Sequence, residues 1–170
     1  MLRVDQDSPQ LEIVAEDPLR DANAIEALFD VTFGPGHFAK TAERLREYNR
    51  SLPEITRVAR LQGKLIAVCR VWPIRVGKTP ALFYGPVAVI PDHQGQRLGL
   101  TVTGEALEAG VAAGWGCAIL VGAPAYFGEI GFEVAPRGKL VLPGPQDETR
   151  ILVRTLTQAV GNLSGLVKAV

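Results

Sequence analysis

One short polar segment carries the residue types that phosphate recognition needs. Gln94, Gly95, Arg97 and Gly99 follow an apolar run at residues 82–90 and precede a stretch with helical periodicity. A strand, a glycine-bearing turn and a helix in this order leave unpaired backbone N–H groups at the positive end of the helix dipole. The segment therefore predicts a phosphate-binding turn.

Two common phosphate-binding motifs, G-x-G-x-x-G and G-x-x-x-x-G-K-[ST], have no match in the chain. The segment Gln94-Gly-Gln-Arg-Leu-Gly99 instead resembles motif A of the GNAT superfamily of acetyl-CoA-dependent N-acetyltransferases, whose pattern is [Q/R]-x-x-G-x-[G/A]. Gln94 and Gly99 match, whereas Arg97 stands where the pattern has its middle glycine. Arg97 keeps its own N–H and adds a guanidinium charge beside the turn.

A second segment extends the resemblance. Residues 120–132, Leu-Val-Gly-Ala-Pro-Ala-Tyr-Phe-Gly-Glu-Ile-Gly-Phe, are similar to the L-V-G-x-x-x-Y-Y-x-x-F-G-F pattern of YhbS-like predicted acetyltransferases, one branch of the GNAT superfamily. The loops at residues 33–36 and 142–145 also resemble that branch. The two motifs together cover residues 82–134.

The resemblance implies an enzyme that uses acetyl-CoA as co-substrate, needs no metal, and acetylates a primary amine of a small molecule or peptide by direct attack. Backbone groups of the strand before the turn would bind the pantetheine arm, and N–H groups of the turn would bind the pyrophosphate. The expected cofactor-binding residues are Val87, Ala88, Val89, Gln94, Gly95, Gln96, Arg97, Leu98, Gly99, Leu100 and Tyr126.

The sequence does not decide which residues act as the general acid and the general base. The family pattern Y-x-x-x-G-F places its tyrosine at position 127, which is Phe127 and cannot donate a proton. Tyr126, one residue earlier, is a candidate general acid, with a packed aromatic or a water donor as alternatives. The strand before the turn has no carboxylate, so Tyr84, His37, Glu54 and a water relay are the candidates for the base.

The acceptor pocket is expected between the first two predicted helices. Phe33, His37, Phe38 and Trp72 are the candidate lining residues, although aromatic residues at such positions also serve as core.

Two rival hypotheses remain beside the enzyme. In the first, a GNAT-fold module binds an acyl-CoA but catalyses poorly and acts as a sensor or interaction domain; Arg97 and Phe127 motivate it. In the second, the chain is an unrelated α/β nucleotide-binding protein.

The elements that position these residues follow from periodicity and turn signals. The predicted strands are residues 11–15, 55–61, 65–76, 82–90, 117–121, 131–134 and 139–142. The predicted helices are residues 20–33, 40–49, 98–113, 126–130 and 147–160. Helices interleaved with a mixed sheet indicate an α/β or α+β fold. The resemblance narrows this to the GNAT acyl-CoA N-acyltransferase fold, a mostly antiparallel mixed sheet, flanked by helices, whose central strands splay near Gly85-Pro86.

Length and charge limit the remaining classes. A chain of 170 residues is expected to form one domain, residues 1–170. Because 18 Lys and Arg balance 18 Asp and Glu, no basic field favours a nucleic acid or an anionic membrane as partner. No signal peptide or membrane span is evident, and Cys69 and Cys117 lie in apolar runs as buried free thiols would. A cytoplasmic protein is expected, and a homodimer is left open.

Overall fold

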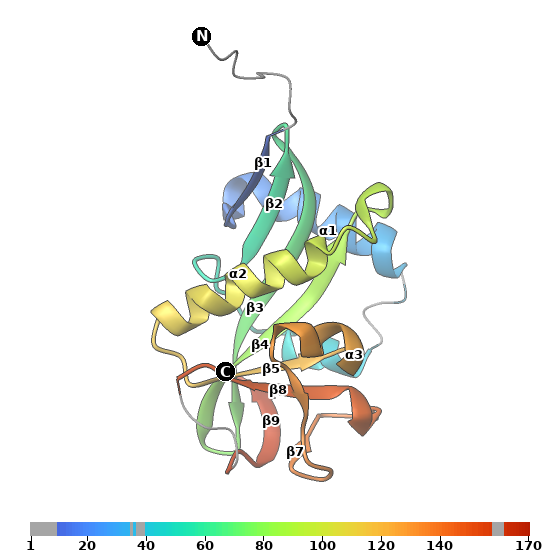
Figure 1. Cartoon of the computed structure of the whole chain (residues 1–170). Helices are drawn as coiled ribbons and strands as arrows, with labels where there is room; N and C mark the ends of the chain where they lie inside the picture. Colours follow the sequence, from blue (N-terminus) through green and yellow to red (C-terminus); the bar gives the residue numbers. More distant parts are fainter. Residues whose placement is uncertain (1–9, 35, 37–39, 158–161) are drawn as a thin grey trace.

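The computed structural model describes residues 10–34, 36, 40–157 and 162–170. The described elements form one mixed sheet with helices on its faces (Figure 1). The strands are β1 (Leu11–Ala15), β2 (Arg57–Leu61), β3 (Lys64–Val76), β4 (Thr79–Val89), β5 (Cys117–Val121), β6 (Glu133–Val134), β7 (Leu140–Val141), β8 (Ile151–Thr155) and β9 (Gly165–Ala169). The α-helices are α1 (Pro18–Phe33), α2 (Leu98–Ala112) and α3 (Pro124–Phe127). The 3₁₀ helices are η2 (Thr41–Leu45), η3 (Pro91–His93), η4 (Gly128–Ile130) and η5 (Glu148–Arg150).

The sheet has the strand order β1-β2-β3-β4-β5-β8-β6, and β9 pairs with both β3 and β7. Neighbours in the main order are antiparallel except β4 and β5, which are parallel and joined through α2. A parallel pair needs such a crossover, and a helix commonly supplies it. The predicted mixed and mostly antiparallel sheet is confirmed.

The two long helices cover opposite faces of the sheet. Ala67 and Cys69 of β3 pack in one hydrophobic cluster with residues of α2, whereas Val68 between them packs with residues of α1. Side chains alternate between the faces of a strand, so this division places α1 and α2 on opposite sides (Figure 1).

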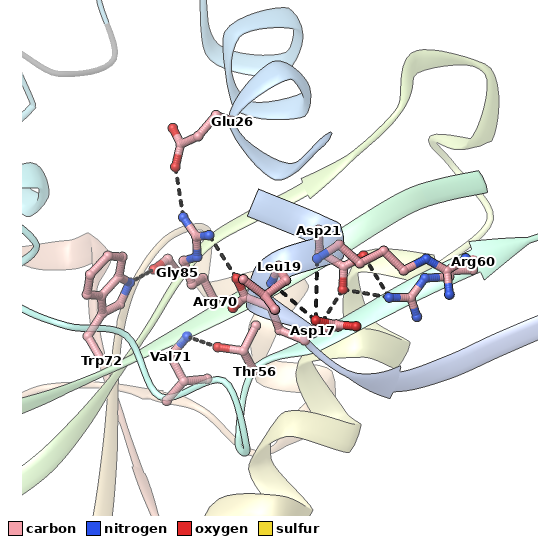
Figure 2. A network of polar contacts seen from close by, with 12 residues as sticks. Asp17, Leu19, Asp21, Glu26, Thr56, Arg60, Arg70, Val71, Trp72 and Gly85 are labelled. Atoms are coloured by element: carbon pink, nitrogen blue, oxygen red, sulfur yellow. Dashed lines mark hydrogen bonds and ion pairs between the residues drawn. The ribbon is translucent and has the colours of Figure 1, made fainter. Parts of the chain in front are cut away.

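Buried ion pairs tie α1 to the strands that it covers (Figure 2). Arg60 of β2 reaches Asp21 of α1 at 2.6 Å, and both side chains are almost fully buried. Arg70 of β3 reaches the buried Glu16 at 3.0 Å and the half-exposed Glu26 of α1 at 2.8 Å. Charges at this depth are retained only when they are paired, so the pairs fix where α1 lies on the sheet.

The central strands separate beside Gly85-Pro86. Pairing between β4 and β5 runs from Leu82 opposite Ala118 to Tyr84 opposite Leu120 and stops there, although β4 continues to Val89. Within the described chain, the backbone beyond Tyr84 therefore has no strand on its β5 side. The interruption predicted at Gly85-Pro86 is confirmed.

The helix predicted for residues 147–160 is wrong. Residues 148–150 form the 3₁₀ turn η5, and residues 151–155 form β8, which pairs with β5. Ile151 packs on the η2 side of the sheet and Leu152 on the α2 side, so the run is apolar because both faces are covered. Residues 158–160 lie outside the described residues.

The helix predicted for residues 40–49 is also wrong in kind, because only the 3₁₀ helix η2 forms there. Leu45 is fully buried, whereas Tyr48 has a positive φ of 57° and is fully exposed. The strand β9 was not predicted at all. Among the described residues, no helix is long and apolar enough to cross a membrane.

Candidate functional site

The turn between β4 and α2 presents a row of free backbone donors. Six successive N–H groups, those of residues 95–100, donate to no other described residue. The first intrahelical bond from this end runs from the Thr101 N–H to the Arg97 carbonyl at 3.0 Å. With no side-chain cap, the positive end of the α2 dipole stays open to an anion. A turn of this shape is suited to an anion, and phosphate binding by Gln94–Leu100 stays a prediction.

The conformation of Arg97 explains why the related pattern has a glycine at this position. Arg97 is the N-cap of α2 and adopts φ 60° and ψ 15°, in the left-handed region that glycine occupies without strain. Its guanidinium forms an ion pair with Glu129 of η4 and is largely exposed. The turn therefore keeps the backbone shape of the pattern, and its charged side chain points towards the segment that follows α3.

Further contacts hold the turn in place. The side-chain amide of Gln94 donates to the Val89 carbonyl at 3.1 Å. The side-chain oxygen of Gln96 lies 3.3 Å from Nδ1 of His93. Gln94 therefore fastens the start of the turn to the end of β4 and keeps the row of N–H groups next to that strand.

The end of β4 directs backbone groups into the gap beside β5. The Ile90 N–H donates to the Ile66 carbonyl at 2.9 Å, so Ile90 and, two residues before it, Ala88 face β3. Backbone groups of neighbouring strand residues point to opposite edges, so those of Val87 and Val89 face away from β3. These are two of the three residues expected to bind an extended ligand here.

A cavity of about 1040 Å³ opens where β4 and β5 separate. One wall comes from Gly85, Pro86 and Val87 of β4, and another from the end of β5 and α3, including Gly122 and Phe127. The opposite side is formed by η2 and by residues 145–150. Its volume and its mixed lining are typical of a small-molecule site.

Phe127 occupies the cavity wall at the position of the family's tyrosine. It is buried and packs so closely over Gly122 that a Cβ there would lie 2.5 Å from the ring. Its ring also makes edge contacts with Tyr126 and Phe132. This wall is therefore apolar where the pattern supplies a hydroxyl.

Tyr126 points to the other end of the gap. A Cβ placed on Gly99 would lie 2.7 Å from the Tyr126 hydroxyl oxygen and 3.5 and 3.6 Å from methyl groups of Val87 and Val89. The hydroxyl thus lies between the start of α2 and the end of β4, and the residue is not part of the cavity wall. Its predicted role as a cofactor-site residue fits this place, and its role as an acid stays a prediction.

Tyr84, the predicted base, is enclosed. Its hydroxyl donates to the Ala106 carbonyl of α2 at 3.2 Å, and its side chain is 1% exposed. Burial, with a smaller effect of nearby Cys69, raises the pKa of Tyr84 well above its ordinary value. Because a base must give up its proton first, this environment opposes the predicted role, and we assign Tyr84 no proton transfer.

The predicted pocket residues divide into three groups. Phe33 lines the cavity. Trp72 does not; it is buried below the wall and donates from Nε1 to the Gly85 carbonyl at 2.7 Å. His37 and Phe38 lie outside the described residues. Glu54, named as an alternative base, is exposed and is not part of the cavity wall.

The sequence interpretation missed the charged lining of the cavity. The charged residues of the wall are Lys40, Arg44, Arg46, Asp147 and Arg150. The first three fall in the helix predicted for residues 40–49 and the last two in the helix predicted for residues 147–160, and neither α-helix forms. The density of Arg and Lys in residues 40–50 was the available signal, but periodicity could not tell which of them turn inward.

Neither cysteine is placed to act as a nucleophile. Burial raises the pKa of Cys69 to about 12, and it also raises the pKa of Cys117. Both thiols are buried, and neither lines the cavity. In the described part of the chain, no group of three or more His, Cys, Asp or Glu residues is arranged to hold a metal ion.

Comparison with known families and structures gives consistent matches. The model of the acetyltransferase (GNAT) family matches residues 22–132, which include the turn, α2 and α3. A search of curated protein sequences finds no match.

Among solved structures, the GNAT family N-acetyltransferase YhbS from Escherichia coli in complex with CoA aligns with a TM-score of 0.80 at 26% identity, covering 97% of this chain and 92% of that one. A GNAT family acetyltransferase from Brucella melitensis in complex with acetyl-CoA aligns with a TM-score of 0.62 at 25% identity, covering 74% and 84%. The ribosomal-protein-S18-alanine N-acetyltransferase from Escherichia coli, at 18% identity and a TM-score of 0.61, covers 91% of this chain and 99% of its own and shares the fold.

Proposed function

The chain belongs to the GNAT acetyltransferase family, and on that premise we propose that it transfers the acetyl group of acetyl-CoA to a primary amine. Residues 1–170 form one catalytic domain in this proposal. The observation that carries it is the row of six free N–H groups at residues 95–100, next to the gap where β4 and β5 separate. Two structural neighbours, at 26% and 25% identity, hold CoA and acetyl-CoA, which supports the choice of ligand.

Each part of the site has a task in this reaction. The N–H groups of residues 95–100 bind the pyrophosphate, and Arg97 adds a positive charge beside it. The backbone of Val87 and Val89 binds the pantetheine arm, and an N–H in this strand polarises the thioester carbonyl. The apolar wall at Phe127 and Gly122 excludes water from the acyl group.

Acetyl-CoA supplies an activated acyl group: the amine forms a C–N bond, the C–S bond breaks, and CoA thiol is released. The amine proton passes to water, because the one carboxylate of the described cavity wall, Asp147, is held by Thr149 through its N–H and hydroxyl at 2.9 and 2.7 Å. Those bonds lower the pKa of Asp147 and make it a weak base. The buried cysteines argue for direct attack rather than an acetyl-cysteine intermediate.

The test is CoA thiol release from acetyl-CoA across a panel of amines, with the N-acetyl product identified by mass spectrometry. We expect release above the hydrolysis rate for at least one amine, together with its N-acetyl product. Tight CoA binding without amine-dependent release would favour the acyl-CoA-binding module, for which Phe127 is the specific observation. Protection against thermal unfolding by ATP or NAD but not by CoA would contradict both.

Tyr126→Phe tests the assignment of the proton donor. We expect kcat to fall at least about tenfold while the CoA dissociation constant changes less than about twofold, because only the leaving thiolate needs the hydroxyl. Tyr48→Phe, a change at an exposed tyrosine outside the cavity wall, is the control and is expected to leave both constants unchanged. An unchanged kcat in Tyr126→Phe would assign the proton to water.

A further inference from the structure

The acceptor side of the cavity is strongly basic. Four of the five charged residues in its wall are cations, and Asp147 is the one described carboxylate there. The chain as a whole has equal numbers of acidic and basic residues, so this imbalance is local. A concave site lined by one sign of charge concentrates ligands of the opposite sign.

Internal pairing leaves most of this charge available. Arg46 is paired with Glu43, which receives both its Nε and its Nη2 at 3.0 and 2.7 Å. Arg44 donates from Nη1 to the neutral Pro143 carbonyl at 2.6 Å. Neither Arg44 nor Arg150 forms an ion pair with any described residue. Lys40 lies over the ring of Phe33 at 5.2 Å, and none of the described carboxylates forms an ion pair with it.

The basic wall is built into the fold. The Thr41 hydroxyl donates to the Pro145 carbonyl, and together with the Arg44 bond it fastens η2 to the turn at residues 143–145. A Cβ on Gly144 would lie 3.1 Å from the Thr41 hydroxyl and 3.3 Å from Arg44 Nη1, so glycine permits this close contact. A guanidinium held in this way loses less entropy when it binds an oxyanion.

This wall is separate from the turn that would bind the pyrophosphate. Leu45 of η2 packs with Phe83 on one face of the sheet, whereas Tyr84 packs with α2 on the other. None of residues 94–100 lines the cavity. The cations of the wall are therefore not part of the proposed pyrophosphate site.

We infer that the acceptor amine carries an oxyanion group, a carboxylate or a phosphate, which Arg44 and Arg150 bind at the η2 side of the cavity. The inference rests on the proposed acetyl transfer and names its substrate class. Arg44 supplies a guanidinium held by the Pro143 carbonyl, Arg150 supplies an exposed one, and Lys40 adds a third positive charge to the wall. Planar guanidinium groups match carboxylate and phosphate oxygens in pairs, which suits this task.

The experiment compares matched amines with acetyl-CoA as donor. β-Alanine is paired with β-alanine amide, and O-phosphoethanolamine with ethanolamine. We expect kcat/KM to be at least about tenfold higher for the anionic member of at least one pair, since hydrogen bonds between a guanidinium and an oxyanion are stronger than those to a neutral group. The pair that shows the larger ratio identifies carboxylate or phosphate as the recognised group.

Two variants connect the preference to the wall. Arg44→Gln and Arg150→Gln are each expected to raise KM for the anionic amine at least about fivefold and to leave KM for acetyl-CoA unchanged. Arg75→Gln is the matched control, because Arg75 is exposed on β3 and lies outside the wall. The Arg150 side chain makes no hydrogen bond to a described residue, and a substitution keeps its backbone hydrogen bonds, so the replacement is not expected to disturb folding.

Calorimetric binding of the same amines to the CoA complex separates this inference from the proposed function. Arginine-dependent binding of the anionic amines without any turnover would support the inference and contradict the acetyl transfer. Equal use and equal binding of neutral and anionic amines would overturn the inference while leaving the transfer intact. A rise in KM for acetyl-CoA, with none for the amine, would also overturn it.

Discussion

A Gly99→Trp variant is expected to lose CoA binding, with the dissociation constant rising at least about a hundredfold, or about 2.8 kcal/mol. Gly99 is the second residue of α2 and lies beneath the Tyr126 hydroxyl, beside the methyl groups of Val87 and Val89. An indole at this point would fill the space between the free N–H groups and the end of β4. It would block the pyrophosphate and the pantetheine arm together.

Two smaller substitutions show whether the loss of CoA affinity depends on the position and on the size of the new side chain, and distinguish it from misfolding. A Cβ on Gly99 would lie 2.7 Å from the Tyr126 hydroxyl, whereas a Cβ on Gly104, five residues along the same helix, meets nothing within 4 Å. We therefore expect Gly99→Ala to weaken CoA binding several-fold and Gly104→Ala to leave it unchanged. Calorimetry gives the affinities, and urea unfolding shows that each variant is folded. Wild-type affinity in a folded Gly99→Trp variant would remove the turn from the cofactor site.

The shape of the turn and the interruption of β4 could be predicted from the sequence because their geometry is local. The turn, the start of α2 and the interruption at Gly85-Pro86 all lie within 20 residues, and glycine and proline determine their shape wherever they occur. The pattern has a glycine at the position of Arg97, and Arg97 adopts the left-handed conformation that glycine takes easily. The backbone of the turn therefore keeps the same local shape with an arginine there.

The acceptor half could not be predicted in the same way, because it depends on contacts between distant residues. Arg44 and Arg150 are more than a hundred positions apart, and η2 is held by carbonyl groups at residues 143 and 145. The sequence of β8 is compatible with an amphipathic helix, because a short apolar run fits both the helical and the strand periodicity. Only its pairing with β5 identifies it as a strand. The possible roles of Tyr126 and Tyr84 depend on the direction of their hydroxyl groups, and the periodicity of the sequence does not predict that direction.

The largest effect on stability is expected from Asp21→Ala, which should lower the free energy of unfolding by about 3–5 kcal/mol. Asp21 and Arg60 are 2% and 4% exposed, and Asp21 accepts Arg60 Nη2 at both carboxylate oxygens, at 2.7 and 2.6 Å. Asp21 also accepts the Asp17 N–H at 2.8 Å at the start of α1. Its removal leaves a buried guanidinium without a counter-charge and a helix terminus without one of its acceptors (Figure 2). Urea unfolding followed by circular dichroism measures the loss.

Glu148→Ala is the matched control, because it removes the Arg137–Glu148 pair, whose side chains are 93% and 40% exposed. Water screens such a pair, so the expected loss is below about 1 kcal/mol. A double variant, Asp21→Leu with Arg60→Met, removes both buried charges and is expected to recover much of the stability lost in Asp21→Ala. If Asp21→Ala instead cost no more than Glu148→Ala, the pair would not hold α1 on the sheet. The position of α1, which ends at Phe33 in the cavity wall, would then depend on its hydrophobic packing and on the Arg70–Glu26 pair.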